Sequence, residues 1–288
     1  MIKKILPILL IVSLLLAFTA CSDKAEQTEP TESTQQVPAS SGDEVTELKV
    51  GFCPGPYSDL WKKAIAPQLE RKGYKISYVE FSDYVQPNLA LANKEINVNM
   101  FQHSIYLDNF SKQHNLSLSL VTEIPTVGMG IWSNTTKSIA ETKKGAVVTI
   151  PNDETNMARG LRVLEAAGLI KLKDGIDKSK ATVDDIGENS LELKIVPTEA
   201  AQIPRTLDSA DLAVVNGNFA ISAGLNPTDS LYNEVLGEGY VNVIAVRTED
   251  LDKQFVKDIK EAATNDEFKA IVDDPQNGFS GFQKPAGW

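Results

Sequence analysis

Strand-like and helix-like stretches alternate along the chain from Glu47 to its end, and this alternation constrains the fold more than any other feature. The segments ELKVGFC, KISYVEF, GAVVTIPND, LELKIVP, ADLAVVNGN and YVNVIAVR predict strands within 47–53, 75–81, 145–153, 191–197, 210–218 and 240–247. Helical spacing follows at 57–72, 154–167 and 249–272. The alternation predicts an α/β fold with mixed, mostly parallel sheets that are flanked by helices.

Two segments read as crossovers between lobes, one around 124–130 and one near 241–246. Residues 47–288 are long enough for one large or two smaller lobes. We therefore predict that lobe 1 comprises residues 47–126 and 244–288, and that lobe 2 is residues 127–243 inserted between them.

The first 21 residues, MIKKILPILLIVSLLLAFTAC, have the pattern of a lipoprotein signal peptide. Lys3 and Lys4 form a positive n-region, and the apolar run 5–17 is too short to cross a bilayer core but suits an h-region. Small residues precede Cys21, which we predict to be lipidated after cleavage. The alternative is an ordinary secretory peptide in which Cys21 is incidental.

Residues 22–46 are polar, acidic and almost free of large apolar side chains, so we predict a disordered tether between the anchor and the folded part. Residues 1–46 carry −3 of the net charge of −11, which leaves −8 on residues 47–288. An acidic folded part argues against nucleic acid or an anionic membrane surface as a partner. With Cys53 as the one remaining cysteine, no disulfide forms within the mature chain.

The sequence offers little to an enzyme or a metal site. The two histidines are His103 and His114, and no hydrolase, kinase or zinc motif is present, so we expect no catalytic residues, no metal and no cofactor. Cys53 and His103 form the one candidate nucleophile–base pair. A buried apolar role for Cys53 is the simpler reading.

The loops after the predicted strands carry the side chains of a binding pocket. The carboxyl ends of strands are where ligands bind in α/β sheets. Aromatic groups there (Tyr84, Phe101, His103 and Tyr106) suit a medium-sized apolar side chain. Arg159 offers two parallel hydrogen bonds to a carboxylate, and Asn156 and Asn216 offer amides. Together they predict a pocket for a free amino acid.

Each of these residues also has an alternative interpretation, in which it serves the fold and does not contact a ligand. Arg159 could lie on the surface of its helix, and Tyr84 and Phe101 could be plain core. Asn216 could cap the helix that follows it.

Several segments resemble the NlpA/MetQ-type lipoproteins, a family of methionine-binding lipoproteins that feed ABC importers. They are FSDYVQPNLAL, NVNMFQHSIYLD, PNDETNMARGLRVLEAAGLIKLKDG, LKIVPTEAAQIPRTLD and the terminal AGW, in the family's order over 47–288. The resemblance implies a two-lobed periplasmic-binding-protein fold (type II-like) that closes on its ligand. It also implies that Tyr84, Phe101, His103 and Tyr106 surround the ligand side chain, and that Asn156, Arg159 and Asn216 surround its amino-acid head.

The chain departs from the family pattern beside these residues, at Tyr57, Ile105, Gly128, Trp132 and Gly217. We therefore expect a free amino acid as the ligand, with L-methionine as the leading candidate and another apolar amino acid, a methionine derivative or a short peptide as alternatives.

The resulting hypothesis is a monomeric, lipid-anchored substrate-binding protein on the outer face of the cytoplasmic membrane, which delivers its ligand to an ABC permease and its ATPase. The competing hypotheses are a Cys53/His103 enzyme and a surface interaction protein with a vestigial pocket.

Overall fold

The computed structural model describes residues 46–288, which belong to one compact unit. The predicted signal peptide, Cys21 and the predicted tether up to residue 45 lie outside the described residues. No helix among residues 46–288 is long and apolar enough to cross a membrane.

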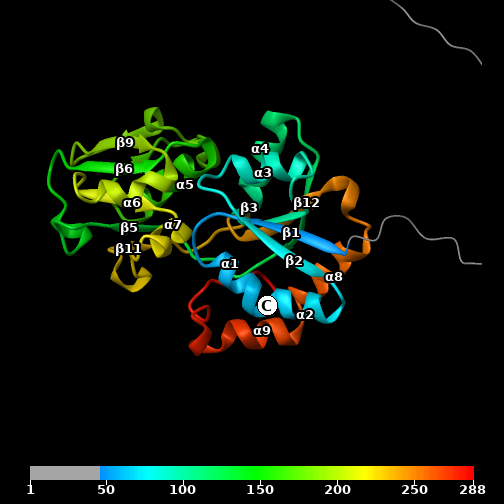
Figure 1. Cartoon of the computed structure of the whole chain (residues 1–288). Coiled ribbons are helices and arrows are strands. Elements are labelled where there is room, and N and C mark those ends of the chain that lie inside the picture. Colours follow the sequence, from blue (N-terminus) through cyan, green and yellow to red (C-terminus); the bar gives the residue numbers. More distant parts are fainter. Residues whose placement is uncertain (1–45) are drawn as a thin grey trace, which may run out of the picture. The chain divides into compact units, whose positions relative to one another are not determined.

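Two five-stranded mixed sheets form the framework (Figure 1). The first has the order β2-β1-β3-β12-β4 and the second the order β11-β5-β10-β6-β9. Lobe 1 is the first sheet with the helices packed on it, and lobe 2 is the second sheet with its helices. The strands are β1 (Glu47–Phe52), β2 (Lys75–Glu80), β3 (Val98–His103), β4 (Leu118–Glu123), β5 (Gly130–Trp132), β6 (Val147–Pro151), β9 (Lys194–Thr198), β10 (Leu212–Val215), β11 (Tyr232–Asn233) and β12 (Asn242–Arg247), with a separate pair β7 (Lys171–Leu172) and β8 (Ile186–Glu188).

Parallel pairing joins β2, β1 and β3 in lobe 1, and β10, β6 and β9 in lobe 2. Antiparallel pairing adds β12 and β4 to the first sheet, and β5 and β11 to the second. All six residues of β3 and of β12 are buried, as expected of strands covered on both faces. The α/β fold of two lobes, each a mixed sheet flanked by helices, is confirmed.

Helices cover both faces of both sheets. They are α1 (Tyr57–Leu60), α2 (Ala66–Arg71), α3 (Gln86–Ala92), α4 (Ser104–His114), α5 (Glu154–Ala166), α6 (Ile203–Thr206), α7 (Gly217–Ser222), α8 (Gln254–Ala262) and α9 (Asp266–Asp273). A π-helical turn (Trp61–Ile65) links α1 to α2, so the helix predicted at 57–72 is continuous. Short 3-10 turns lie at Ile139–Glu141, Lys178–Lys180, Val183–Asp185, Ala200–Gln202, Pro227–Asp229, Thr248–Asp250 and Pro275–Asn277.

Large apolar side chains hold each lobe together. In lobe 1, Trp61 and Leu69 pack with Phe52 of β1 and with Phe268 of α9. In lobe 2, α5 covers one face of the sheet, and α6 and α7 cover the other. Each lobe therefore has its own core, and each carries loops at the carboxyl ends of its parallel strands.

The structure corrects three expectations about elements. The C-terminal helix predicted at 249–272 is two helices, α8 and α9, because Asn265 caps α9 by accepting a hydrogen bond from the N–H of Phe268. Phe101 and His103 lie on β3 itself rather than in a loop after it. The strands β3, β4, β5, β7, β8 and β11 were not predicted.

The two crossovers meet at Thr126. Its hydroxyl accepts a hydrogen bond from the N–H of Asn242 at 2.8 Å, and its backbone forms a β-bridge with Gln283. β12 begins at Asn242, shortly before the predicted return to lobe 1 at residue 244. The residue bounds of the lobes, 47–126 with 244–288 and 127–243, stay a proposal.

Candidate functional site

A cavity lies where loops and strand ends of the two lobes meet. Both lobes contribute to its wall, and all seven side chains that the sequence singled out are part of it. The wall is made by Tyr57, Tyr84, Phe101, Gln102, His103, Tyr106, Val127, Asn156, Arg159, Asn216, Gly217, Asn218 and Asn242. The location of the seven is therefore established, while their role in binding stays a prediction.

Three rings form the apolar side of the cavity. The centroid of Tyr84 lies 5.7 Å from that of Phe101 and 5.8 Å from that of Tyr106, and the Tyr106 hydroxyl donates to the carbonyl of Tyr84 at 3.1 Å. Burial raises the pKa of both phenols well above the usual range, so the hydroxyls stay neutral. These contacts present ring faces and edges that suit an apolar or thioether group.

His103 ends β3 and caps α4. Its Nδ1 accepts a hydrogen bond from the N–H of Tyr106 at 3.1 Å, so in the neutral ring Nε2 carries the proton. Burial and then the positive charge of Arg159 lower the pKa of His103 well below its usual value, while the Asn156 side chain acts weakly in the opposite direction. Nε2 has no hydrogen-bond partner among the described residues. The ring therefore offers one donor to a ligand.

Arg159 projects from α5 and is 4% exposed, so the surface reading is wrong. Its Nε donates to the Glu234 carboxylate at 2.9 and 3.0 Å, and its Nη2 donates at 2.6 Å. Glu234 occupies one edge of the guanidinium, so the predicted two-bond grip on a ligand carboxylate stays a prediction for the opposite edge, formed by Nη1 and the second N–H of Nη2. None of the hydrogen bonds of residues 46–288 uses Nη1, which remains for a ligand.

The two predicted amides are linked. Asn216 stands at the N-cap position of α7, but its side chain makes no capping bond there. It donates instead to Oδ1 of Asn156 at 2.8 Å. The Oδ1 atom of Asn216 is buried and has no partner among the described residues, so the cavity also presents an acceptor.

Of the five positions that depart from the family pattern, Tyr57 and Gly217 line the cavity. The Tyr57 hydroxyl accepts from the N–H of Val127 at 3.2 Å, and burial raises the pKa of Tyr57 to about 12. The other three lie outside the wall. Ile105 packs on Gly239, Gly128 lies against Gln283 and Glu234, and Trp132 is part of the core between β10 and α7.

Sequence reasoning missed several residues of the site. Glu234 follows the two-residue strand β11, where no periodic pattern marks it. Gln102 lines the cavity while its amide bonds to Asn88 and Asn99, which are both fully buried. The alternation of amides and aromatics in NVNMFQH could have indicated this network.

Asn218 links the two lobes beside the cavity. Its Oδ1 accepts from the Tyr84 hydroxyl at 2.6 Å, and its Nδ2 donates to the carbonyl of Pro54 at 2.9 Å. Gly55 has φ +135°, and a Cβ at that position would lie 2.7 Å from the Cβ of Asn218. Only glycine permits this approach.

The geometry does not favour a Cys53/His103 nucleophile pair. The Cys53 thiol donates to the carbonyl of Asp83 at 3.2 Å, and burial raises its pKa well above the usual value. A buried, protonated thiol is a poor nucleophile. Among residues 46–288, no three His, Cys, Asp or Glu side chains gather as a metal site.

Comparison with known proteins agrees with the fold. Residues 48–286 match the family model described as NlpA lipoprotein. The D-methionine-binding lipoprotein MetQ of Salmonella typhi is 38% identical over 234 residues, which is 80% of this chain and 86% of that protein. Outer membrane lipoprotein 2 of Mannheimia haemolytica is 36% identical over 251 residues, 87% of each chain. A nutrient binding protein from Burkholderia cenocepacia, solved bound to methionine, superposes with a TM-score of 0.76 at 38% identity, covering 81% of this chain and 97% of that one.

Proposed function

Because the chain belongs to the NlpA lipoprotein family, we propose that it is the substrate-binding lipoprotein of an ABC importer and captures a free amino acid, with L-methionine as the leading candidate. The protein is anchored through lipid on Cys21 at the outer face of the cytoplasmic membrane. It binds as a monomer and hands its ligand to the permease, whose transport is driven by an ATPase. It acts by binding rather than by catalysis, and it needs no cofactor.

The observation that carries the proposal is the polar balance of the cavity. Arg159 brings a positive charge that Glu234 already neutralises, with side chains 5% and 10% exposed. A buried site with no net charge from this pair favours a neutral or zwitterionic ligand over an anion. Arg159 Nη1 and His103 Nε2 are donors for a carboxylate, and Asn216 Oδ1 is an acceptor for an ammonium group.

The apolar end of the cavity supports methionine. The rings of Tyr84, Phe101 and Tyr106 suit a thioether, which gains from contact with ring edges. The relatives that are named for methionine binding, or were solved with methionine, share the fold at 38% identity.

Ligand binding stabilises the contact between the lobes. Residues from both lobes form the cavity wall, so a ligand there bridges them and favours the closed form. The closed form is the one that docks on the permease.

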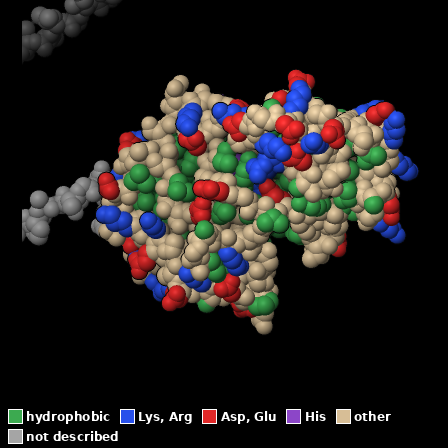
Figure 2. Space-filling model, turned by 180° about the vertical axis from the view of Figure 1, so that it is seen from behind, with side chains coloured by type: hydrophobic (Ala, Val, Ile, Leu, Met, Phe, Trp, Pro, Cys, Tyr) green, Lys and Arg blue, Asp and Glu red, His purple; other side chains and the backbone are tan. Residues whose placement is uncertain are grey.

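Lys/Arg and Asp/Glu side chains are interspersed on the face shown in Figure 2, and the net charge of residues 47–288 is −8, which disfavours nucleic acid as a partner.

A thermal-shift screen tests the proposal. The chain from Asp43 to Trp288 is unfolded and refolded to remove carried ligand, then heated with common amino acids, methionine derivatives and short methionyl peptides. A ligand at a thousandfold excess over its dissociation constant adds about 4 kcal/mol, and each kcal/mol raises Tm by about 2–4 °C. A shift confined to L-methionine supports the proposal as stated.

The departures at Tyr57 and Gly217 carry the second candidate, since both line the cavity. In that case the transport role is kept and the ligand is another apolar amino acid, a methionine derivative or a short peptide. A shift with one of these alone selects it. Silence across the whole panel would contradict both candidates.

A further inference from the structure

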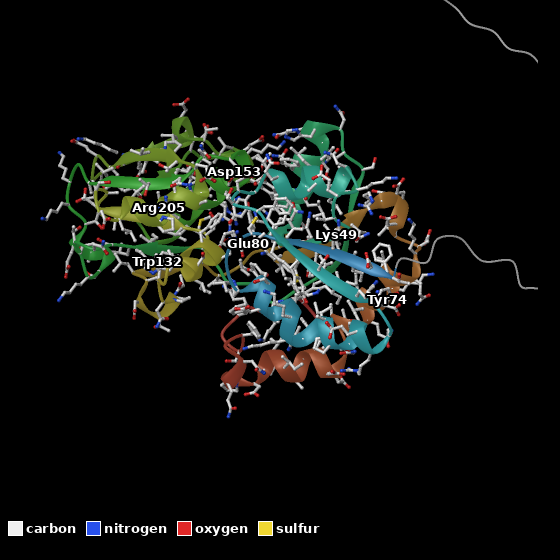
Figure 3. All side chains as sticks on the ribbon, viewed as in Figure 1. Lys49, Tyr74, Glu80, Trp132, Asp153 and Arg205 are labelled. Carbon is white, nitrogen blue, oxygen red and sulfur yellow. The ribbon has the colours of Figure 1, made fainter. Side chains whose placement is uncertain are left out.

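A chain of polar contacts, half-buried at Asp153 and buried at Asn216, runs from the start of α5 to the cavity. Asp153 caps α5, and Figure 3 labels it on the part of lobe 2 that faces lobe 1. Its Oδ1 accepts from the N–H of Asn156 at 3.0 Å and from the Thr155 hydroxyl at 3.1 Å. The Nδ2 of Asn156 also donates to Asp153, at 3.0 Å to Oδ1 and 3.1 Å to Oδ2.

These contacts fix the direction of every bond in the chain. A carboxylate accepts hydrogen bonds and has none to donate. The NH₂ of Asn156 must therefore face Asp153, so its Oδ1 faces away and accepts from Nδ2 of Asn216 at 2.8 Å. Because Nδ2 of Asn216 is used in this bond, Oδ1 is the side-chain atom left for another contact. That oxygen is buried and has no partner among the described residues, and Asn216 is part of the cavity wall.

We propose that Asp153 is a positioning residue, which acts through Asn156 and Asn216 to hold an acceptor oxygen toward the ligand and so selects ligands that carry an ammonium group. This inference rests on the proposed amino-acid binding and adds the origin of its selectivity. Asp153 itself does not line the cavity wall.

Helix capping alone does not account for an aspartate at this position. Asn, Ser and Thr cap helices about as well as Asp, and each would avoid burying a charge. Burial raises the pKa of Asp153, and the hydrogen bonds from Asn156 and Thr155 act in the opposite direction. What distinguishes a carboxylate from these alternatives is that it has no donor, and this property alone fixes the direction of the amide chain.

The test uses two ligands that differ in one group. L-Methionine carries the ammonium, and 4-(methylthio)butanoic acid is the same molecule without it. Calorimetry on the chain Asp43–Trp288 gives both affinities for the wild type and for Asp153→Asn. The variant keeps the size and the capping oxygen but adds an NH₂ donor, so the chain of amides is free to reverse.

We expect the wild type to prefer methionine strongly, because a site built to hydrogen-bond a group rejects the analogue that lacks it. In Asp153→Asn the ratio of the two affinities should fall by at least about tenfold, with the affinity for the analogue changed by less than about threefold. The matched control is Thr155→Val, which removes another bond to Asp153 without reversing the chain. It should keep the wild-type ratio.

An unchanged ratio in Asp153→Asn overturns the inference, and so does an equal loss for both ligands, since that is the result of a purely structural cap. If the wild type binds neither compound, the proposed function fails together with the inference. Wild-type binding with an unchanged ratio in the variant removes the inference alone. If Asp153→Asn does not fold, Asn156→Ala interrupts the same chain one member later, and the same fall in the ratio is expected.

Discussion

Arg159 is shared between the fold and the ligand. Two of its nitrogens bind Glu234, and Nη1 with the second N–H of Nη2 remains for a bound carboxylate. Glu234 in turn accepts from the N–H of Met129, so the ion pair also anchors the segment after the crossover. Removing Arg159 therefore affects both binding and folding, and the two effects can be separated.

We expect Arg159→Ala to weaken ligand binding by about 2–5 kcal/mol, the range for losing one member of a buried charged pair. The free energy of unfolding should fall by about 3–5 kcal/mol, because Glu234 is left buried without its partner. In Arg159→Ala/Glu234→Ala, urea unfolding should show most of the stability restored, while calorimetry still shows weak binding. Restored binding in the double variant would mean that Arg159 does not contact the ligand.

His103 makes stability depend on pH in a defined window. Its pKa is held well below the ordinary 6.5 in the folded protein, so below pH 6.5 the unfolded chain takes up a proton that the folded one does not. The free energy of unfolding is unaffected by this group above pH 6.5 and falls as pH drops below it, by at most about 1.4 kcal/mol per pH unit.

Urea unfolding between pH 7.5 and 5 tests this. His103→Asn keeps an acceptor for the capping bond from Tyr106 and should remove most of the slope. His114→Asn removes the other histidine, at the exposed end of α4. This variant is the control, and its slope of stability against pH should equal that of the wild type. An equal slope in wild type and His103→Asn would contradict the assignment.

At the scale of elements, the first turn of α7 fastens lobe 2 to lobe 1. The two hydrogen bonds of Asn218, to Tyr84 and Pro54, join the two lobes. The Tyr84 ring also packs on the Phe219 ring, with the ring centroids 4.8 Å apart. Each such bond contributes about 0.5–1.5 kcal/mol. The contact exists only when the lobes are together, so it acts on ligand release.

We expect Asn218→Ala to lower ligand affinity by about 1–3 kcal/mol, mainly through faster dissociation in stopped-flow experiments. Gly55→Ala should act in the same direction, because its Cβ would collide with Asn218. The control is Gly175→Ala, a glycine with φ +76° and open space around it, which should lower stability but leave dissociation unchanged. Equal dissociation rates in all three variants would remove α7 from the closing contact.

At the scale of the whole molecule, Cys53 reports on the opening of the lobes. It is the one cysteine in the chain Asp43–Trp288, is 1% exposed, and packs with Phe101 and Tyr106, whose rings line the cavity. A thiol reagent reaches it only when the structure opens. Saturating ligand should slow labelling in proportion to its excess over the dissociation constant. An equal labelling rate with and without ligand would mean that Cys53 is exposed by local opening that leaves the ligand bound.

The longer strands and helices could be predicted from the sequence because local periodicity marks them. The runs that became β1, β2, β6, β9, β10 and β12 are apolar and bounded by turns, and α5 has both its Asp153 cap and Gly168 beyond its end. β5 is three residues long and is fixed by its partners β10 and β11, so no local pattern marks it. The division of the predicted C-terminal helix into α8 and α9 could have been predicted from Asn265, a good capping residue that is followed by Asp266 and Glu267.

The site was predictable as a set of residues but not as a set of bonds. Aromatic, amide and guanidinium groups recur after the strands, which was enough to place seven side chains around one cavity. The pairing of Arg159 with Glu234 joins positions 75 residues apart, and the chain from Asp153 to Asn216 depends on which end of each amide faces its neighbour. Both are decided by tertiary packing, which a single sequence does not encode locally.

The position of β12 has a consequence for the order in which the protein can be assembled. β12 lies between β3 and β4 and is the last strand along the chain, whereas every strand of the second sheet precedes it. A chain that emerges from its N-terminus onward can therefore finish the sheet of lobe 2 first. Lobe 1, although it begins earlier, keeps β4 without a neighbour until residues 242–247 arrive. The lobe that starts first is thus the last to be completed, and the binding site is complete only after the C-terminal part of the chain has emerged.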